Sequence, residues 1–356
     1  MWPSRRLLDL LNIAVPIIQA PMAGAMDSAL VVAACEAGAL GALPCAMLDP
    51  AKIRSEVATI RSRTSAPFNL NFFCHAPPRN DLQELARWQA RLARYYDELG
   101  LPHDAGNANR APFDADLCAL VEALKPPVVS FHFGLPSPGL VARVKASGAV
   151  VLSSATTVAE ARWLEAHGVD AVIAQGAEAG GHRGMFLTED IAAQPGTMAL
   201  VPQIVDAVKV PVIASGGIAD ARGIVAAFAL GASGVQIGTA YLKCTESKIS
   251  PMHRAALAAA RDDETVLTNV FTGRTARGFA NRLVREQGPI AADAPSFPLA
   301  SGAVAPLRAQ AERRGSSDFS PLWAGQAAAL GPETDAVMLT KMLCDGAQSL
   351  LHRLGA

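Results

Sequence analysis

A glycine-rich stretch, QGAEAGGHRG at residues 175–184, places a titratable side chain in a permissive backbone. It follows the short apolar run DAVIA, residues 170–174, so we expect a loop at the end of a buried strand. Gly180, Gly181 and Gly184 surround His182, and glycine lets a backbone take positive φ or come close to a ligand. An imidazole can take or give a proton near neutral pH. A mobile surface turn with a solvated histidine fits these residue types equally well.

Two further glycine-rich segments follow later apolar runs. ASGGI covers residues 214–218, just before a helical pattern, and QIGTAY covers residues 236–241. Bare backbone N–H groups and helix N-termini at strand ends favour a phosphate. A phosphate-bearing substrate, flavin mononucleotide (FMN) and an empty structural turn are all compatible, whereas the lack of GxGxxG after a first strand disfavours a Rossmann dinucleotide site. The candidate binding residues are Ser215, Gly216, Gly217, Gln236, Ile237, Gly238 and Thr239.

Polar side chains also fall at the ends of other apolar runs. Asn69 and Asn71 share one face of a strand by the period of two, and a buried asparagine needs a partner. His75 lies just beyond that run. His132 lies between two phenylalanines that we expect to point to the opposite side, although a lone histidine in an apolar strand is more often a satisfied core residue than a catalyst. Met22 offers a soft apolar surface, and a structural turn explains it equally well.

Eight short apolar runs alternate with longer helical patterns, which indicates βα units around a parallel sheet. Eight parallel strands close into a barrel more readily than they lie open, so we predict an α/β fold of the TIM (β/α)8 barrel type. The functional site of such a barrel lies at the carboxyl ends of the strands, where the loops above occur. The eight runs cover residues 16–22, 40–44, 67–73, 128–133, 150–155, 171–176, 211–217 and 234–241.

The pattern changes after the eighth run. Residues 242–330 show no alternating strand signal, so we predict a smaller helical domain on the substrate side, inserted after the eighth strand. Residues 331–356 end in an amphipathic pattern that we expect to return and complete the barrel of residues 1–241. The segment from Cys74 to Pro127 is too long for a simple connection, which suggests an inserted helix or helix pair that forms a lid or cap.

Composition narrows the class of protein. Of 356 residues, 51% are hydrophobic and 18% charged, which is enough apolar material for a large core. The 31 basic and 32 acidic residues give a net charge of −1, so we expect neither nucleic acid nor a membrane as partner. The six cysteines lack CxxC spacing, which argues against disulfides and a zinc site, and we predict no metal. Without a leader pattern or a long apolar run, we predict a cytoplasmic protein.

Together these motifs resemble the nitronate monooxygenase family, and most closely its class I members. Six segments occur in the family's order within residues 16–241: QAPMAG, NLNFFCHAPP, SFHFG, QGAEAGGHRG, ASGGI and QIGTAY. Related flavin barrels, such as FMN-dependent enoyl-acyl carrier protein reductases and NADH:quinone reductases, carry loops similar to the stretch at 175–184. The NLNFFCHAPP segment favours the nitronate monooxygenases.

The resemblance implies a non-covalently bound FMN across the barrel mouth. His182 would be the catalytic residue, removing a proton from a nitroalkane or holding a nitronate anion, and His132 would be a second polar group in the substrate pocket. Gly180 would let its loop approach the flavin, and Gly217 with residues 236–239 would hold the phosphate. The flavin contacts would come from Met22, Asn71, Gln175, Gly180 and Gly181.

The implied reaction is oxidation of an alkyl nitronate, with propionate 3-nitronate as the natural candidate. Oxygen would complete it through a flavin semiquinone, giving a carbonyl compound plus nitrite or nitrate. The alternatives are an NAD(P)H-dependent FMN reductase of a quinone or enoyl thioester and a non-catalytic flavin-binding protein. The small-molecule nitronate and O2 would be the partners of a monomer or homodimer.

The substrate pocket departs from the class I pattern. Relatives line it with tyrosines and a lysine from the segment after the barrel, whereas no tyrosine follows Tyr241 here. The corresponding stretch offers Phe297, Leu299 and Arg308. Arg308 would be the charge partner of a carboxylated nitronate, because a guanidinium matches a carboxylate, although a solvated helix arginine is the simpler interpretation. His253 would supply a further polar group.

Overall fold

The computed structural model describes residues 2–78, 81–103 and 110–355. In this part of the chain, eight parallel strands form one sheet in the order β1-β9-β8-β6-β5-β4-β3-β2. Each of the eight apolar runs contains one of these strands, which confirms the predicted α/β barrel. The strands are β1 Ile17–Gln19, β2 Gly41–Pro44, β3 Phe68–Phe73, β4 Val128–His132, β5 Val150–Ala155, β6 Ala171–Gln175, β8 Val212–Ser215 and β9 Gly234–Ile237.

The two edge strands of the sheet meet and close the barrel. β1 pairs with β9, and Ile18 also forms a parallel bridge with Leu40, just before β2. At this seam the Gln19 N–H donates to Leu40 O (3.0 Å), and Gln19 Oε1 accepts from the Ala42 N–H (3.0 Å). A fully buried glutamine therefore completes the backbone hydrogen bonds where the ladder is weakest.

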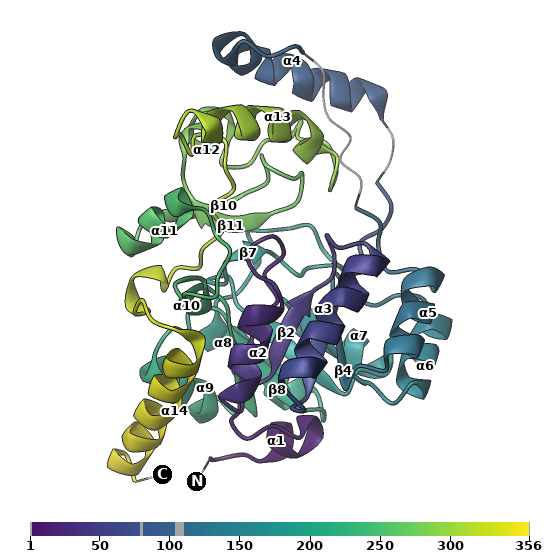
Figure 1. The fold of residues 1–356 in the computed structure, drawn as a ribbon, viewed down its shortest axis with the longest axis vertical. Coiled ribbons are helices and arrows are strands. Elements are labelled where there is room, and N and C mark those ends of the chain that lie inside the picture. Colours follow the sequence, from purple (N-terminus) through teal and green to yellow (C-terminus); the bar gives the residue numbers. More distant parts are fainter. Residues whose placement is uncertain (1, 79–80, 104–109, 356) are drawn as a thin grey trace.

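Helices surround the barrel (Figure 1). The C-terminal α14 packs against α9 and α2, so the end of the chain returns to the barrel wall. At the end away from the second unit, Leu7, Leu8 and Leu11 of α1 pack on residues inside the sheet. No described helix is long and apolar enough to cross a bilayer. These helices are α1 Arg6–Leu11, α2 Ser28–Glu36, α3 Pro50–Arg63, α5 Ala115–Leu124, α6 Pro138–Ala146, α7 Val158–Ala166, α8 Thr197–Ala207, α9 Ala221–Ala229 and α14 Ala336–Arg353.

A second unit lies over one end of the barrel (Figure 1). The expectation that residues 242–330 lack strands is wrong, because β10 and β11 form an antiparallel pair there. Each has only four residues, and the third strand of their sheet, β7, comes from the glycine-rich loop after β6, so no alternating pattern marks this sheet. Its elements are β7 Gly181–His182, α11 Pro251–Ala258, β10 Thr265–Thr268, β11 Ala276–Phe279, α12 Arg282–Gln287, α13 Ala300–Arg313 and the short 3₁₀ helix Ala328–Leu330. The short helix α10 (Thr239–Leu242) directly follows β9 and packs in the barrel core.

The long insertion between β3 and β4 contributes to both units. α5 packs beside α3 and α6 on the barrel, whereas α4 (Leu82–Leu99) packs on α13 (Figure 1). Trp88 and Leu92 of α4 are fully buried in a hydrophobic core shared with α12 and α13. Arg282 of α12 also pairs with Glu98 of α4 (2.6 Å). We infer that α4 is an integral part of the second unit's hydrophobic core and not a separate lid.

Truncation of α4 tests this packing. We expect Leu92→Ala to lower the free energy of unfolding by about 2–4 kcal/mol, because it leaves a cavity in the shared core. The matched control on the same helix is Leu82→Ala, whose side chain is 72% exposed, and its urea unfolding midpoint should stay close to the parent value. Equal unfolding midpoints for both variants would contradict a role of α4 in the core.

Candidate active site

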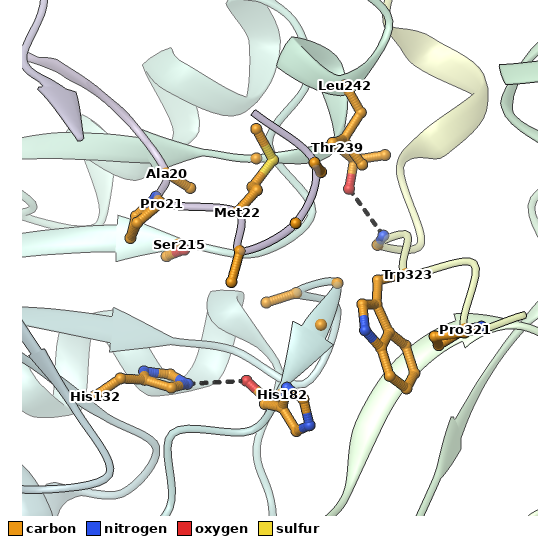
Figure 2. Close-up of a pocket in the computed structure, with 18 of the residues that line it drawn as sticks. Ala20, Pro21, Met22, His132, His182, Ser215, Thr239, Leu242, Pro321 and Trp323 are labelled. Atoms are coloured by element: carbon orange, nitrogen blue, oxygen red, sulfur yellow. Dashed lines mark hydrogen bonds between the residues drawn. The ribbon is translucent and has the colours of Figure 1, made fainter. Parts of the chain in front are cut away.

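The carboxyl ends of the barrel strands and the second unit enclose a cavity of about 420 Å³, a size typical of cofactor and small-molecule sites. Figure 2 shows His132 and His182 on one side of it, below the Ala20–Met22 segment, with Trp323 beside them. Ile237 does not line the cavity, because its side chain packs in the barrel core. The candidate residues that do line it are Met22, Asn71, His132, Gln175, Gly180, Gly181, His182, Ser215, Gly216, Gly217, Gln236, Gly238 and Thr239.

His182 is held in place because the loop that carries it becomes a strand. β7 pairs antiparallel with β11, with His182 opposite Ala276 and Gly181 opposite Arg277. The next N–H group, that of Arg183, donates to Thr275 O (2.9 Å). The loop after a barrel strand is thus the third strand of the second unit's sheet.

Two side chains tie the same loop to the end of β6. Gln175 donates from Nε2 to His182 O (3.0 Å) and accepts at Oε1 from the Gly184 N–H (2.7 Å). Arg183 is fully buried, and its guanidinium donates to the carbonyl oxygens of Gln175 and Gly176. The alternative of a mobile, solvated turn therefore does not describe this loop. Gln175 lines the cavity, but both ends of its amide already hold the loop.

The glycines of the loop meet separate constraints. A Cβ at Gly180 would lie 2.5 Å from the backbone nitrogen of Gly325, so glycine admits the second unit's chain there. Gly181 has a φ of +74°, in the left-handed region that favours glycine. A Cβ at Gly184 would lie 2.9 Å from His132 Cε1, so glycine brings the loop against that ring.

The His182 ring lies among aromatic rings and has one polar contact. Its centroid is 5.3 Å from that of Phe297 and 5.5 Å from that of Trp323. Its Nε2 lies 2.9 Å from Thr272 Oγ1, and the Thr272 hydroxyl donates to Arg274 O (3.3 Å). In the tautomer that carries its hydrogen on Nε2, the ring donates to this hydroxyl and keeps a lone pair on Nδ1. Within the described chain, Nδ1 makes no hydrogen bond and is not fully buried.

Burial and nearby cations keep this imidazole uncharged. Burial holds the pKa of His182 well below its ordinary value, and the guanidinium groups of Arg110 and Arg274 lower it further. Burial also lowers the pKa of His132 to about 3. Both rings are therefore neutral at physiological pH, and a neutral ring can accept a proton.

Both ring nitrogens of His132 are already engaged. Nε2 donates to His182 O (3.2 Å), the contact dashed in Figure 2, and Nδ1 accepts from the Ser154 hydroxyl (3.0 Å). Together with Gln175, His132 thus fixes the peptide group of His182. This geometry suits a positioning residue better than a free base.

Phe133 corrects one expectation about the neighbours of His132. Phe131 is fully buried in the barrel core, as strand alternation requires. Phe133 was expected to share that direction, but its φ of +71° takes it out of the extended conformation, and its ring lies 6.1 Å from that of His182. The Arg274 guanidinium lies over Phe133, 3.9 Å from the ring centroid. Alternation fails here because the strand has already ended at His132.

The two asparagines of β3 share one partner on the next strand. Asn69 Nδ2 donates to Ser130 Oγ (2.7 Å), and Asn71 Nδ2 donates to the same oxygen (2.9 Å). Asn71 Oδ1 makes no hydrogen bond in the described chain and is not fully buried, so it remains an acceptor for a ligand.

The far end of the cavity has a bare backbone. Gly216 and Gly217 have φ angles of +116° and +70°, a conformation that other residues rarely adopt. In the described chain, the N–H groups of Gly217 and Gly238 donate no backbone hydrogen bond. Glu178 lines the same region, but its carboxylate accepts from the N–H (2.8 Å) and hydroxyl (2.8 Å) of Thr197 at the start of α8. The acid is therefore directed toward a helix end, and the glycines can face an anion.

Charged side chains at the substrate end differ from those expected. Arg308 lines the cavity, but its side chain is 48% exposed and pairs with Glu312 (2.7 Å). His253 donates from Nε2 to Trp323 O (3.1 Å) and therefore supports the backbone. Arg110 lines the cavity close to His182 and was not anticipated. No motif around Arg110 marks it as a site residue. Its side chain reaches the cavity only through tertiary contacts, such as that with the ring of Phe297.

Comparison with known proteins gives the family. A family model described as nitronate monooxygenase matches residues 4–346. The chain is 41% identical to a nitronate monooxygenase of Paraburkholderia phytofirmans, over 96% of this chain and 94% of the relative. It is also 41% identical to a nitronate monooxygenase of Pseudomonas aeruginosa, over 96% and 98% of the two chains. A structure of nitroalkane oxidase from Streptomyces ansochromogenes superposes with a TM-score of 0.89 at 37% identity, covering 98% of this chain and 99% of that one.

These matches span both the barrel and the second unit, so they cover the whole cavity and not the barrel alone. They agree with the resemblance carried by the six motifs. The chain is a flavin-dependent oxidoreductase and belongs to the nitronate monooxygenase family.

Proposed function

We propose that the protein binds FMN in this cavity and oxidises alkyl nitronates with O2 to a carbonyl compound plus nitrite or nitrate, with propionate 3-nitronate as a substrate. One observation carries the proposal. The uncharged imidazole of His182 is fixed at one end of the cavity. At the other end, glycine N–H groups make no backbone hydrogen bond within the described residues. That arrangement suits a phosphate-bearing cofactor and an acid–base group for its substrate.

The residues present fit FMN. Gly217 and Gly238 would offer N–H groups to the phosphate. Asn71 Oδ1 would accept from the flavin ring, and Met22 would cover it with apolar surface. When bound, FMN supplies the redox centre that takes electrons from the nitronate and passes them to O2.

His182 accounts for a preference for the anion over its neutral parent. Nδ1 accepts the α-proton of a nitroalkane, but a lowered pKa makes the ring a weak base. The imidazolium formed is also opposed by Arg110 and Arg274. A preformed nitronate needs no proton transfer, and the same cations attract it. The Phe297 and Trp323 rings pack beside His182 and give this end of the cavity an apolar wall.

A spectroscopic experiment tests cofactor and reaction together. We expect the purified protein to carry a flavin spectrum and to release FMN on denaturation. Anaerobic addition of propionate 3-nitronate should change this spectrum rapidly, whereas NADH should not. Rapid bleaching by NADH with no response to nitronate would instead support a reductase. A flavin that responds to neither compound, with no steady-state O2 uptake, would support a non-catalytic binding protein.

Replacement of His182 tests its role in proton transfer. We expect His182→Asn to lower kcat/KM for a neutral nitroalkane by about 10²–10⁴-fold, the usual contribution of a positioned base, and to affect the preformed nitronate much less. Steady-state O2 uptake with both forms of one substrate measures this. His167→Asn, on the outer surface of the barrel, is the matched control. Equal losses on the two substrate forms would rule out proton abstraction by His182.

The pH profile tests the charge of the same ring. An ordinary histidine with a pKa near 6.5 would lose about tenfold of its neutral form between pH 7.5 and 5.5. Because the pKa of His182 is lowered, the neutral base persists through this window and is lost only at more acidic pH. We therefore expect kcat/KM for a neutral nitroalkane to change less than threefold from pH 7.5 to about 5.5. A tenfold decline with a midpoint near 6.5 would contradict the buried, neutral ring.

A further inference from the structure

Arg110 lies where the reacting end of the cavity meets the second unit. Its guanidinium carbon is 5.7 Å from the centroid of Phe297, the ring that also lies 5.3 Å from His182. The side chain lines the cavity and is close enough to His182 to disfavour a positive charge on that ring. Within residues 2–78, 81–103 and 110–355, its guanidinium forms no ion pair with a carboxylate, and it lies over the ring of Phe297. A cation therefore faces the space in which the substrate must lie.

His75 gives this arginine a fixed position. Nε2 of His75 donates to the backbone carbonyl of Arg110 (2.9 Å). The His75 ring packs edge-on against Phe297, with centroids 4.8 Å apart and planes at 90°. His75 is only 5% exposed, so this contact is shielded from water. The histidine after β3 thus anchors the segment that carries Arg110 to the aromatic wall of the site.

The other cations near the cavity have partners of their own. Arg308 pairs with Glu312 and Lys248 with Asp27 (3.4 Å). Arg274 keeps its positive charge, but its guanidinium donates to the Met185 carbonyl and lies over the Phe133 ring. The two acids that line the cavity are Glu312, held by Arg308, and Glu178, held by Thr197. No carboxylate among the described lining residues therefore competes for Arg110. An anionic group of the substrate can fill that role.

We propose that Arg110, positioned by His75, binds the remote carboxylate of a nitronate substrate and makes the enzyme selective for carboxylated nitronates. This inference rests on the proposed function. A guanidinium forms charge-assisted, paired hydrogen bonds with a carboxylate, and the partly buried site strengthens them. Arg308, suggested by the sequence, is less suited, because Glu312 already neutralises it at an exposed position.

Equilibrium binding tests the proposal without turnover. Succinate has the same heavy-atom chain as propionate 3-nitronate, and butyrate matches propyl-1-nitronate, which lacks the remote carboxylate. Calorimetric titration of the FMN-loaded enzyme should show succinate bound more tightly than butyrate. We expect Arg110→Gln to reduce the ratio of the two affinities by about 10- to 100-fold, the range for a hydrogen-bonded charge. Arg110→Lys should retain part of the preference.

Two more variants separate Arg110 from its neighbours. Arg308 lines the same cavity, and the control variant Arg308→Gln should keep the parent ratio of succinate affinity to butyrate affinity. His75→Phe preserves a ring against Phe297 but removes the hydrogen bond to Arg110 O, and we expect a smaller loss of the ratio than in Arg110→Gln. If Arg308→Gln loses the preference and Arg110→Gln keeps it, the proposal is overturned. The same holds if no variant changes the ratio.

Kinetics then distinguish failure of this inference from failure of the proposed function. In steady-state assays, Arg110→Gln should raise KM for propionate 3-nitronate about 10-fold or more, with a much smaller change for propyl-1-nitronate. A parent enzyme that oxidises neither compound would contradict the proposed function itself. A parent that oxidises both, with Arg110→Gln weakening both equally, would overturn only the assignment of Arg110.

Discussion

The antiparallel pairing of β7 with β11 is the constraint on which the site depends. Two residues from a barrel loop, Gly181 and His182, act as a strand of the second unit's sheet. The buried guanidinium of Arg183 ties the same loop back to the end of β6. Because the loop is bonded to both units, the position of His182 depends on how the second unit packs on the barrel. A loop fixed in this way loses little entropy when a ligand binds, which favours a preorganised site.

Burial then sets the chemistry of that histidine. Aromatic rings and two arginines surround it, and both circumstances disfavour its charged form. As a result, the His182 ring is a weak base, and the positive charges around it make the cavity favourable for anions. His132, with both nitrogens engaged, adds rigidity without a second base. The site is therefore better adapted to a substrate that arrives as an anion than to one that must be deprotonated.

Local patterns predicted the barrel well but the second unit poorly. Each of the eight strands is a short apolar run, buried on both faces and separated by helices, so composition alone marks it. The sequence pattern does not predict the sheet of β10, β11 and β7, because its strands are two to four residues long and one of them comes from a glycine-rich loop. Helix α4 was recognised from its amphipathic pattern, but the surface that it covers lies about 200 residues away, as in the contact of Arg94 with Glu286.

For the site, the sequence by itself determined which residue types stand at the strand ends. A short segment of sequence is enough to predict the glycines at 216 and 217, the histidine after β6 and the asparagines on β3. The reason is that strand period and backbone φ depend on near neighbours in the chain. Only the tertiary structure decided that Gln175 and Arg183 hold the loop, that Phe133 turns toward the site, and that Arg110 faces the cavity. Those outcomes depend on burial and on contacts between segments far apart in the chain, which no local pattern encodes.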